Sequence, residues 1–123
     1  MPEKIKDFYD LDAWKKGHKF VLEIYNATKK FPKEELYGIT SQLRRAAFSI
    51  TANIAEGFSR YHYNDKVRFY HNARGSVSEI QNFLFLAKDL SFLTEGYLKY
   101  LFDFSEEINK LINGLIRSIE KQK

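Results

Sequence analysis

The sequence predicts an all-α protein built as an antiparallel, up-and-down four-helix bundle. Apolar residues recur at steps of three and four in four long stretches, which keeps them on one side of an α-helix. Short polar connections separate these stretches, and helices joined by short loops pack as antiparallel neighbours. No stretch has the apolar–polar alternation of a strand. A chain of 123 residues has the size of one domain.

The first helix is predicted over residues 11–30 and follows a charged leader at residues 1–10, which we expect to be loosely ordered. Asp10 or Asp12 is suited to cap this helix. Two apolar stripes on the helix indicate two neighbours. The stripes are Leu11, Trp14, His18, Val21, Tyr25 and Thr28 as the bundle seam, and Gly17, Phe20, Ile24, Ala27 and Phe31 on a second side.

The second helix is predicted over residues 40–59, and the rest of the chain is organised around it. Its middle, AAFSITANIA at residues 46–55, contains no charged residue. A helix without a charged face is enclosed on several sides. We therefore expect it to be covered by its own bundle and by another subunit of an oligomer.

Two further helices complete the predicted domain, which spans residues 11–121. The third is predicted over residues 64–90, where the small pair Gly75-Ser76 lets another helix approach closely. The fourth is predicted over residues 95–121, with Thr94 as its cap, and it has one apolar and one charged side.

Composition excludes several kinds of site. The chain has no cysteine, so it contains no disulfide, thiolate metal site or cysteine nucleophile. No apolar run approaches the roughly 20 residues of a membrane-spanning helix, and we expect a cytoplasmic protein. The formal net charge is +4, with the surplus mainly in residues 1–60. Aromatic residues make up 16% of the chain, which is more than one small core readily buries. This surplus indicates a surface that binds a partner.

A polar stripe follows the second helix, and Glu79 on the third helix faces it in the predicted bundle. Glu56 and Glu79 as a carboxylate pair would suit acid–base chemistry. A structural network with arginine and asparagine partners is the commoner arrangement, and we favour it. The histidines and glutamates do not have the spacing of metal ligands, and the sequence contains no cofactor-binding motif. We therefore expect no enzymatic activity. The predicted network consists of Arg45, Ser49, Asn53, Glu56 and Glu79.

Basic residues form a candidate nucleic-acid surface, with solvated lysines on exposed faces as an equally weighted interpretation. Lysine and arginine neutralise phosphates, and aromatic rings stack on unpaired bases. Tyr61, His62, Tyr63 and Tyr70 are interleaved with some of these cations. The candidate phosphate contacts are Lys15, Lys16, Lys19, Lys29, Lys30, Arg44, Arg60 and Arg68.

Three segments together resemble a known bacterial family, the 23S rRNA intervening-sequence proteins. The segments are DLDAWKKGHKFVLEIY at 10–25, FPKEELYGITSQLRRAAFSITANIAEGFSR at 31–60 and ARGSVSE at 73–79. One departure is Arg74, where the family often has a small apolar residue. The motif positions carried over are Arg45, Ser49, Asn53, Glu56, Gly57, Arg60, Gly75, Ser76 and Glu79.

The resemblance implies a ring-shaped homo-oligomer, typically a pentamer, of four-helix subunits. It also implies a fold similar to the accessory variability determinant of diversity-generating retroelements, a basic pentamer that binds nucleic acid and a reverse transcriptase. The family name records a gene location within ribosomal RNA genes, and the family's biochemical role is not established. Our leading hypothesis is a non-enzymatic oligomer that binds structured RNA. The alternative is a structural adaptor that docks a polymerase or reverse transcriptase without RNA affinity of its own.

Overall fold

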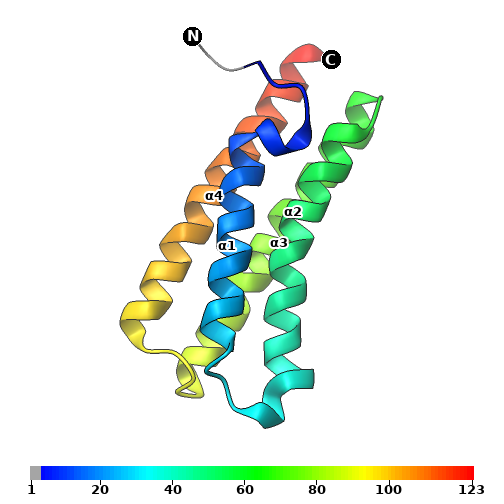
Figure 1. The fold of residues 1–123 in the computed structure, drawn as a ribbon. Coiled ribbons are helices and arrows are strands. Elements are labelled where there is room, and N and C mark those ends of the chain that lie inside the picture. The colour runs from blue at the N-terminus through cyan, green and yellow to red at the C-terminus, as the bar shows by residue number, and fades with distance from the viewer. Residues whose placement is uncertain (1–3) are drawn as a thin grey trace.

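Four long helices form the protein, as the computed structural model of residues 4–123 shows (Figure 1). In the view of Figure 1, α1 and α3 run downward, α2 and α4 run upward, and the described chain begins and ends at the upper end. The all-α class and the four helices are confirmed, and each predicted boundary lies within two residues of the observed one. The helices are α1 (Asp12–Thr28), α2 (Ser41–Ser59), α3 (Tyr63–Asp89) and α4 (Glu95–Gln122).

The start of α1 differs from the prediction. Neither Asp10 nor Asp12 caps the helix through its side chain, and Leu11 occupies the cap position. Asp10 Oδ2 instead accepts hydrogen bonds from the backbone N–H groups of Lys6 and Asp7, each at 3.1 Å. These two bonds hold the pKa of the Asp10 carboxyl below its ordinary value, because they favour the charged form.

The leader is more ordered than expected over its second half. Phe8–Asp10 forms a 3-10 turn, and the Phe8 ring packs edge-on against Trp14 with centroids 5.5 Å apart. The prediction of a loosely ordered leader is therefore wrong for this turn, whereas residues 1–3 lie outside the described residues.

The α1 side chains that pack into the core are those of the second predicted stripe, from Gly17 to Phe31. Phe20 and Ile24 on this stripe are fully buried. The stripe predicted as the bundle seam lies nearer the surface, where Trp14 is half-buried and His18 is exposed. The rings of Trp14 and His18 stack on each other at 4.8 Å. On α2, the buried residues are Leu43, Ala46, Ala47, Ile50, Thr51, Ile54 and Gly57.

The α2 helix is not enclosed on all sides by its own chain. Phe48 is 46% exposed and Ala52, one turn further on, is exposed as well. The uncharged middle of α2 therefore has one apolar side that the rest of the described chain leaves uncovered.

α2 and α3 form the most extensive helix pair, and Gly57 permits their close approach. A Cβ atom at Gly57 would lie 2.6 Å from Tyr70 Cε1 and 3.2 Å from the carbonyl oxygen of Lys66, which is closer than packed atoms approach. The Lys66 ammonium donates to the Phe58 carbonyl at 2.6 Å, so it satisfies an end carbonyl of α2. Gly75 does not play the expected part within the chain, because a Cβ there would meet no atom within 4 Å.

Polar bonds also join α3 to α4. Gln81 donates to Ser105 Oγ at 2.9 Å and to Glu106 Oε1 at 2.7 Å. Arg74 is half-buried, and its Nη1 donates to Asn113 Oδ1 at 3.0 Å. The α4 helix begins with the predicted cap, since Thr94 Oγ1 accepts from the Tyr97 N–H at 3.1 Å.

The substitution Gly57→Ala should destabilise the fold by about 1–3 kcal/mol, because the added methyl group overlaps a buried ring and a backbone carbonyl. Urea denaturation measures the free energy of unfolding. The matched control is Gly96→Ala in α4, where a Cβ meets no atom within 4 Å. The control should be neutral or stabilising by up to about 1 kcal/mol. Equal effects at the two glycines would contradict the close approach at Gly57.

Tyr70 should make the fold sensitive to alkaline pH. Burial raises the pKa of the Tyr70 phenol from 10.0 to about 12, so its folded pKa lies above its unfolded one. The stabilisation is fully present below pH 10 and is lost as the pH rises from 10 to 12, by about 2–3 kcal/mol. Tyr70→Phe should reduce this loss in urea titrations at pH 9 and 11.5. Tyr37→Phe, at a side chain 93% exposed, is the control, and an unchanged pH profile in Tyr70→Phe would contradict the assignment.

Candidate nucleic-acid interface

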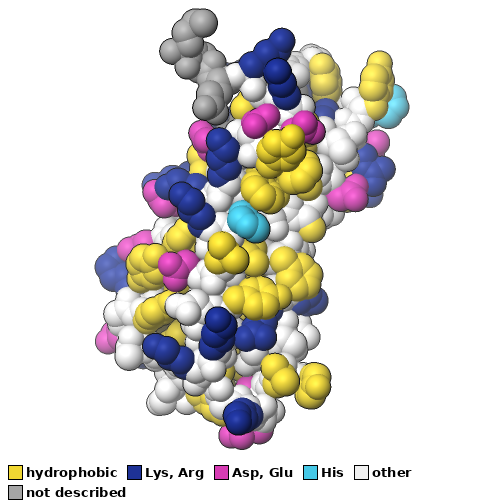
Figure 2. Space-filling view, in the orientation of Figure 1, with side chains coloured by type: hydrophobic (Ala, Val, Ile, Leu, Met, Phe, Trp, Pro, Cys, Tyr) yellow, Lys and Arg dark blue, Asp and Glu magenta, His cyan; other side chains and the backbone are white. Residues whose placement is uncertain are grey.

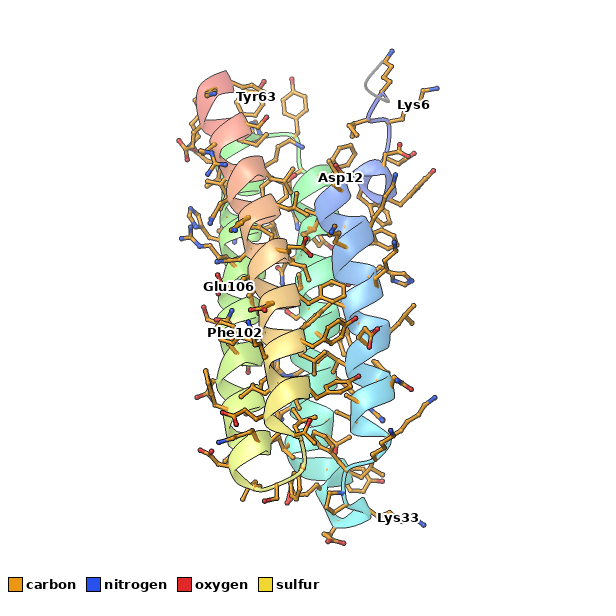
Figure 3. The ribbon with its side chains drawn as sticks, turned by 90° about the vertical axis from the view of Figure 1, so that its left-hand side faces the viewer. Lys6, Asp12, Lys33, Tyr63, Phe102 and Glu106 are labelled. Carbon is orange, nitrogen blue, oxygen red and sulfur yellow. The ribbon has the colours of Figure 1, made fainter. Side chains whose placement is uncertain are left out.

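The eight candidate phosphate contacts lie on the surface, but the fold separates them into three places. Seven are exposed and Arg44 is half-buried. Figure 3 marks the two ends of the bundle, with Lys33 at one end and Tyr63 at the other. The three groups are Lys15, Lys16 and Lys19 on the first half of α1, Lys29, Lys30 and Arg44 at the Lys33 end, and Arg60 and Arg68 at the Tyr63 end.

The outward face of α1 carries a line of lysines and neutral residues, with Glu23 beside it. The line runs through Lys15, Lys19, Leu22, Asn26 and Lys30 at steps of three and four residues, which share one face of a helix. Within residues 4–123, no carboxylate lies within ion-pair distance of Lys19 or Lys30. Figure 2 shows Lys and Arg side chains recurring along this side of the molecule. Lysines outnumber carboxylates on this face, which gives it a net positive charge.

Lys16 lies beside this line and is engaged differently. Its ammonium pairs with Glu107 Oε1 on α4 at 3.2 Å, and both side chains are largely exposed. An exposed ion pair of this kind contributes little to stability, so Lys16 remains able to exchange partners.

Arg44 is held in a fixed position at the Lys33 end. Its Nε donates to Thr28 Oγ1 at 2.9 Å, and its guanidinium carbon lies 4.7 Å from the centroid of the Tyr25 ring. With Lys29 and Lys33 it lines a groove of about 400 Å³ between the end of α1 and the start of α2. The groove therefore has three cations at its rim.

At the opposite end, two arginines are arranged around one ring. The guanidinium carbons of Arg60 and Arg68 lie 4.6 and 4.9 Å from the centroid of Phe69. Arg60 pairs with Glu56 at 3.1 Å, and Arg68 pairs with Asp65 at 3.7 Å. Cation–π contact with Phe69 orients both guanidinium groups.

Three of the four interleaved aromatic residues lie at this end and face solvent. Tyr61 is 89% exposed, Tyr63 is 40% exposed, and His62 between them is exposed. Tyr70 is 2% exposed and belongs to the core, as its place in the apolar spacing of α3 predicts, so it is not available to stack on a base. A period-3.6 apolar stripe on α3 places Tyr70 inward, and that stripe outweighs its position beside basic residues.

The polar stripe on α2 meets α3 in a short network. Arg45 forms an ion pair with Glu79. Ser49 Oγ lies 3.0 Å from Ser76 Oγ, and Asn53 Nδ2 donates to the Ser49 carbonyl at 2.8 Å and to Ser49 Oγ at 3.1 Å. Four of the five predicted members therefore come together between the two helices.

Glu56 lies outside this network. It pairs with Arg60 one turn along α2, and it is 11 positions from Arg45, the partner of Glu79. At 1.5 Å per residue, this spacing along α2 places the two carboxylates roughly 16 Å apart, which is too far for them to act together as an acid–base pair. Each carboxylate has an arginine partner instead.

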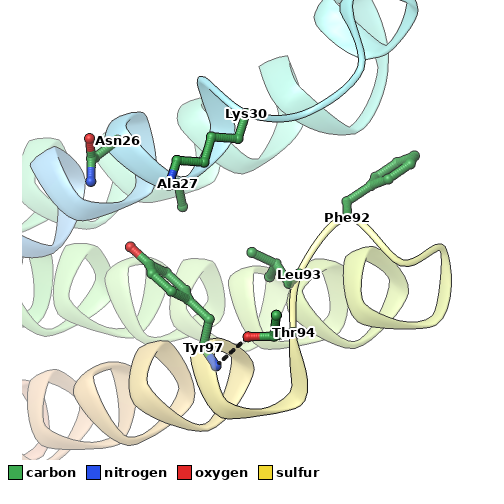
Figure 4. A pocket seen from close by; sticks show the side chains of 7 residues that line it. All are labelled: Asn26, Ala27, Lys30, Phe92, Leu93, Thr94 and Tyr97. Atoms are coloured by element: carbon green, nitrogen blue, oxygen red, sulfur yellow. Dashed lines mark hydrogen bonds between the residues drawn. The ribbon is translucent and has the colours of Figure 1, made fainter.

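A small cavity lies between the end of α1, the α3–α4 connection and the start of α4 (Figure 4). Its volume is about 180 Å³. Lys30 and Asn26 border it from α1, and Phe92 and Leu93 border it from the connection. The Tyr97 hydroxyl points away toward Glu23, at 3.4 Å. Burial, followed by the Glu23 charge, raises the pKa of the Tyr97 phenol. The lining is mainly apolar and offers room for a small apolar group.

Sequence reasoning missed Lys66. Its ammonium closes the end of α2, and desolvation lowers its pKa from the ordinary 10.5. No pattern in the sequence relates Lys66 to the carbonyls of Gly57 and Phe58, because the contact depends on how α3 folds back on α2.

Two further observations concern the part of the chain that the structure describes. None of its helices combines the length and apolar character needed to cross a bilayer. No three of its histidine and carboxylate side chains are grouped so that they would hold a metal ion.

Comparison with known proteins places the chain in a family. The sequence profile of the family described as 23S rRNA-intervening sequence protein matches residues 9–114. A crystal structure from Bacteroides thetaiotaomicron, described as a protein of unknown function from the S23 ribosomal protein family, is similar with a TM-score of 0.79 and 25% identity. That match covers 85% of this chain and 95% of the other. Among curated proteins there is no match. The resemblance found in the sequence motifs is confirmed, and the chain belongs to the 23S rRNA-intervening sequence protein family.

Proposed function

We propose that the protein is a non-enzymatic bundle that binds structured RNA through the positive outward face of α1. The observation that carries this proposal is the row of lysines from Lys15 to Lys30, in which Lys19 and Lys30 have no carboxylate within ion-pair distance in residues 4–123. At 1.5 Å per residue the line extends over roughly 22 Å, long enough to follow several phosphates. Lysines that neutralise phosphates release counterions, which supplies sequence-independent affinity.

Assembly into a ring, with five subunits as the expected number, is part of the proposal. A closed ring needs two different patches that meet head to tail. Two exposed apolar areas support this arrangement. Tyr25 and Phe48 lie on α1 and α2, where Figure 2 shows hydrophobic side chains gathered, and Phe85 and Leu86 lie on α3. Figure 3 places Phe102, the neighbour of Phe85, on the α3 side of α4 and away from α1. A ring also repeats the α1 lysines around one assembly, which strengthens binding to an extended polyanion.

The second candidate function is an adaptor that docks a partner protein such as a polymerase or reverse transcriptase. A notch of about 300 Å³ between α3 and α4 favours it. Phe85 and Phe102 supply apolar surface there, and Lys99 and Asp103 supply polar groups at the margin. Large apolar side chains beside polar ones are typical of protein interfaces. This candidate predicts no appreciable RNA affinity at physiological salt.

Removal of cations on α1 and directly after its end should weaken RNA binding. The triple variant Lys19→Gln, Lys29→Gln and Lys30→Gln removes up to three phosphate contacts. The slope of log affinity against log salt concentration should fall by roughly 2 units, since each contact contributes about 0.7–0.9. Fluorescence anisotropy with duplex and single-stranded RNA across a salt series measures both affinity and slope.

The matched control removes the same charge from α4 through Lys99→Gln, Lys110→Gln and Lys121→Gln, all at exposed positions. It should lower the affinity and the slope much less. Equal losses in the two variants would show that only net charge matters and would contradict an interface on α1. No binding by the unmodified protein at physiological salt would favour the adaptor.

Ala52→Glu should dissociate the proposed oligomer without unfolding the subunit. Ala52 is exposed on the single chain, so a glutamate there remains solvated, whereas in an interface it would be buried without a partner at a cost of several kcal/mol. Light scattering coupled to gel filtration should give a multiple of the 14.6 kDa chain for the unmodified protein and the chain mass for the variant.

Ser118→Glu, at an exposed position on α4, is the control and should keep the oligomeric mass. An oligomer that tolerates Ala52→Glu would show that this side of α2 is open to water. Circular dichroism of both variants should retain the helical signal.

A further inference from the structure

We propose that the α2–α3 connection is a stacking site for unpaired nucleotides, so that the RNA recognised by this protein carries a single-stranded loop, bulge or end. The site consists of Tyr61, His62 and Tyr63, with Arg60 and Arg68 beside them. This inference rests on the proposed function and adds to it the class of RNA structure that is bound.

No structural role explains why the Tyr61 side chain is exposed. The side chain is 89% exposed, and its only ring contact in the described chain is an edge-on approach to His62 at 5.1 Å. A tyrosine in this position adds no burial to the core, and it leaves a large apolar ring in water. Residues 60–62 only connect two helices, and a turn of this length requires no aromatic side chain.

The three rings form an open notch on the surface. Tyr61, His62 and Tyr63 alone line a notch of about 360 Å³. The Tyr61 and His62 planes stand at 87° to each other, so the faces of both rings remain uncovered by one another. Every nucleobase has a flat face that stacks on such a ring, which makes this kind of site tolerant of sequence.

Two oriented cations lie at the same end of the bundle as the notch. Arg60 adjoins Tyr61 in the chain, and Arg68 is held against the same Phe69 ring as Arg60. Their carboxylate partners, Glu56 and Asp65, form exposed pairs that are worth little in water and exchange readily for phosphate. Arginine binds phosphate through two parallel hydrogen bonds, so the pair supplies backbone contacts beside the stacked base.

The combination favours unpaired RNA over duplex RNA. In a duplex the base faces are covered by neighbouring pairs, and the grooves offer edges, hydroxyls and phosphates. Exposed rings therefore gain nothing from a duplex, whereas splayed bases in a loop or end supply the faces they need. The two arginines favour a polyanion over an apolar protein surface.

The test compares two RNA probes of equal length, a fully paired duplex and a hairpin with a pyrimidine loop, by fluorescence anisotropy at one salt concentration. Tyr61→Ala should weaken hairpin binding by about 5- to 100-fold, the range for loss of one stacked base, and should leave duplex binding unchanged. Tyr61→Phe keeps the ring and should retain hairpin affinity within about twofold of the unmodified protein. Tyr37→Ala, at a side chain 93% exposed near the opposite end, is the control and should bind both probes normally.

The outcomes separate this inference from the proposed function. If the unmodified protein binds both probes equally and Tyr61→Ala changes neither, RNA binding through α1 stands and the stacking site is overturned. If the protein binds neither probe, both are overturned. If Tyr61→Ala alters the oligomeric mass, the ring is a subunit contact and the stacking site is again overturned. A loss confined to the hairpin, with unchanged mass and helical signal, supports it.

Discussion

The close approach of α2 and α3 is the constraint on which the rest of the structure depends. Gly57 leaves room for the Tyr70 ring, and the Ser49–Ser76 contact joins the two helices further along. Helices that approach closely need small side chains or paired polar groups where they meet, because any larger or unpaired group forces them apart. These contacts determine the relative register of α2 and α3, and α1 and α4 pack around the pair.

This arrangement has a consequence for the surface. Gly57, Ser49 and Ser76 lie where α2 and α3 meet, whereas several large apolar side chains face outward. Phe48 on α2 and Phe85 on α3 are about half exposed. A protein with this many aromatic residues would ordinarily bury more of them, and their position on two sides of the bundle is the physical basis for proposing a head-to-tail assembly.

The polar surface divides into a long positive face and a compact end. The α1 face offers flexible lysines, which act as point charges on phosphate and read no base. The α2–α3 end offers rings and arginines that are oriented by Phe69. Under the proposed function, the two surfaces would contact different parts of one RNA, with the lysines on the phosphate backbone and the rings on unpaired bases.

The sequence by itself determined the helical class, the four helices to within two residues at each end, and the family. The apolar spacing, the helix-ending residues and the family motif are all local features of the chain, so they can be recognised from the sequence alone. Only the tertiary structure decided which α1 stripe is buried, that the Tyr61 ring is in water, and that Glu56 pairs with Arg60 while Glu79 pairs with Arg45. Each of these depends on the rotation and register of one helix against another, which apolar spacing within a single helix does not specify.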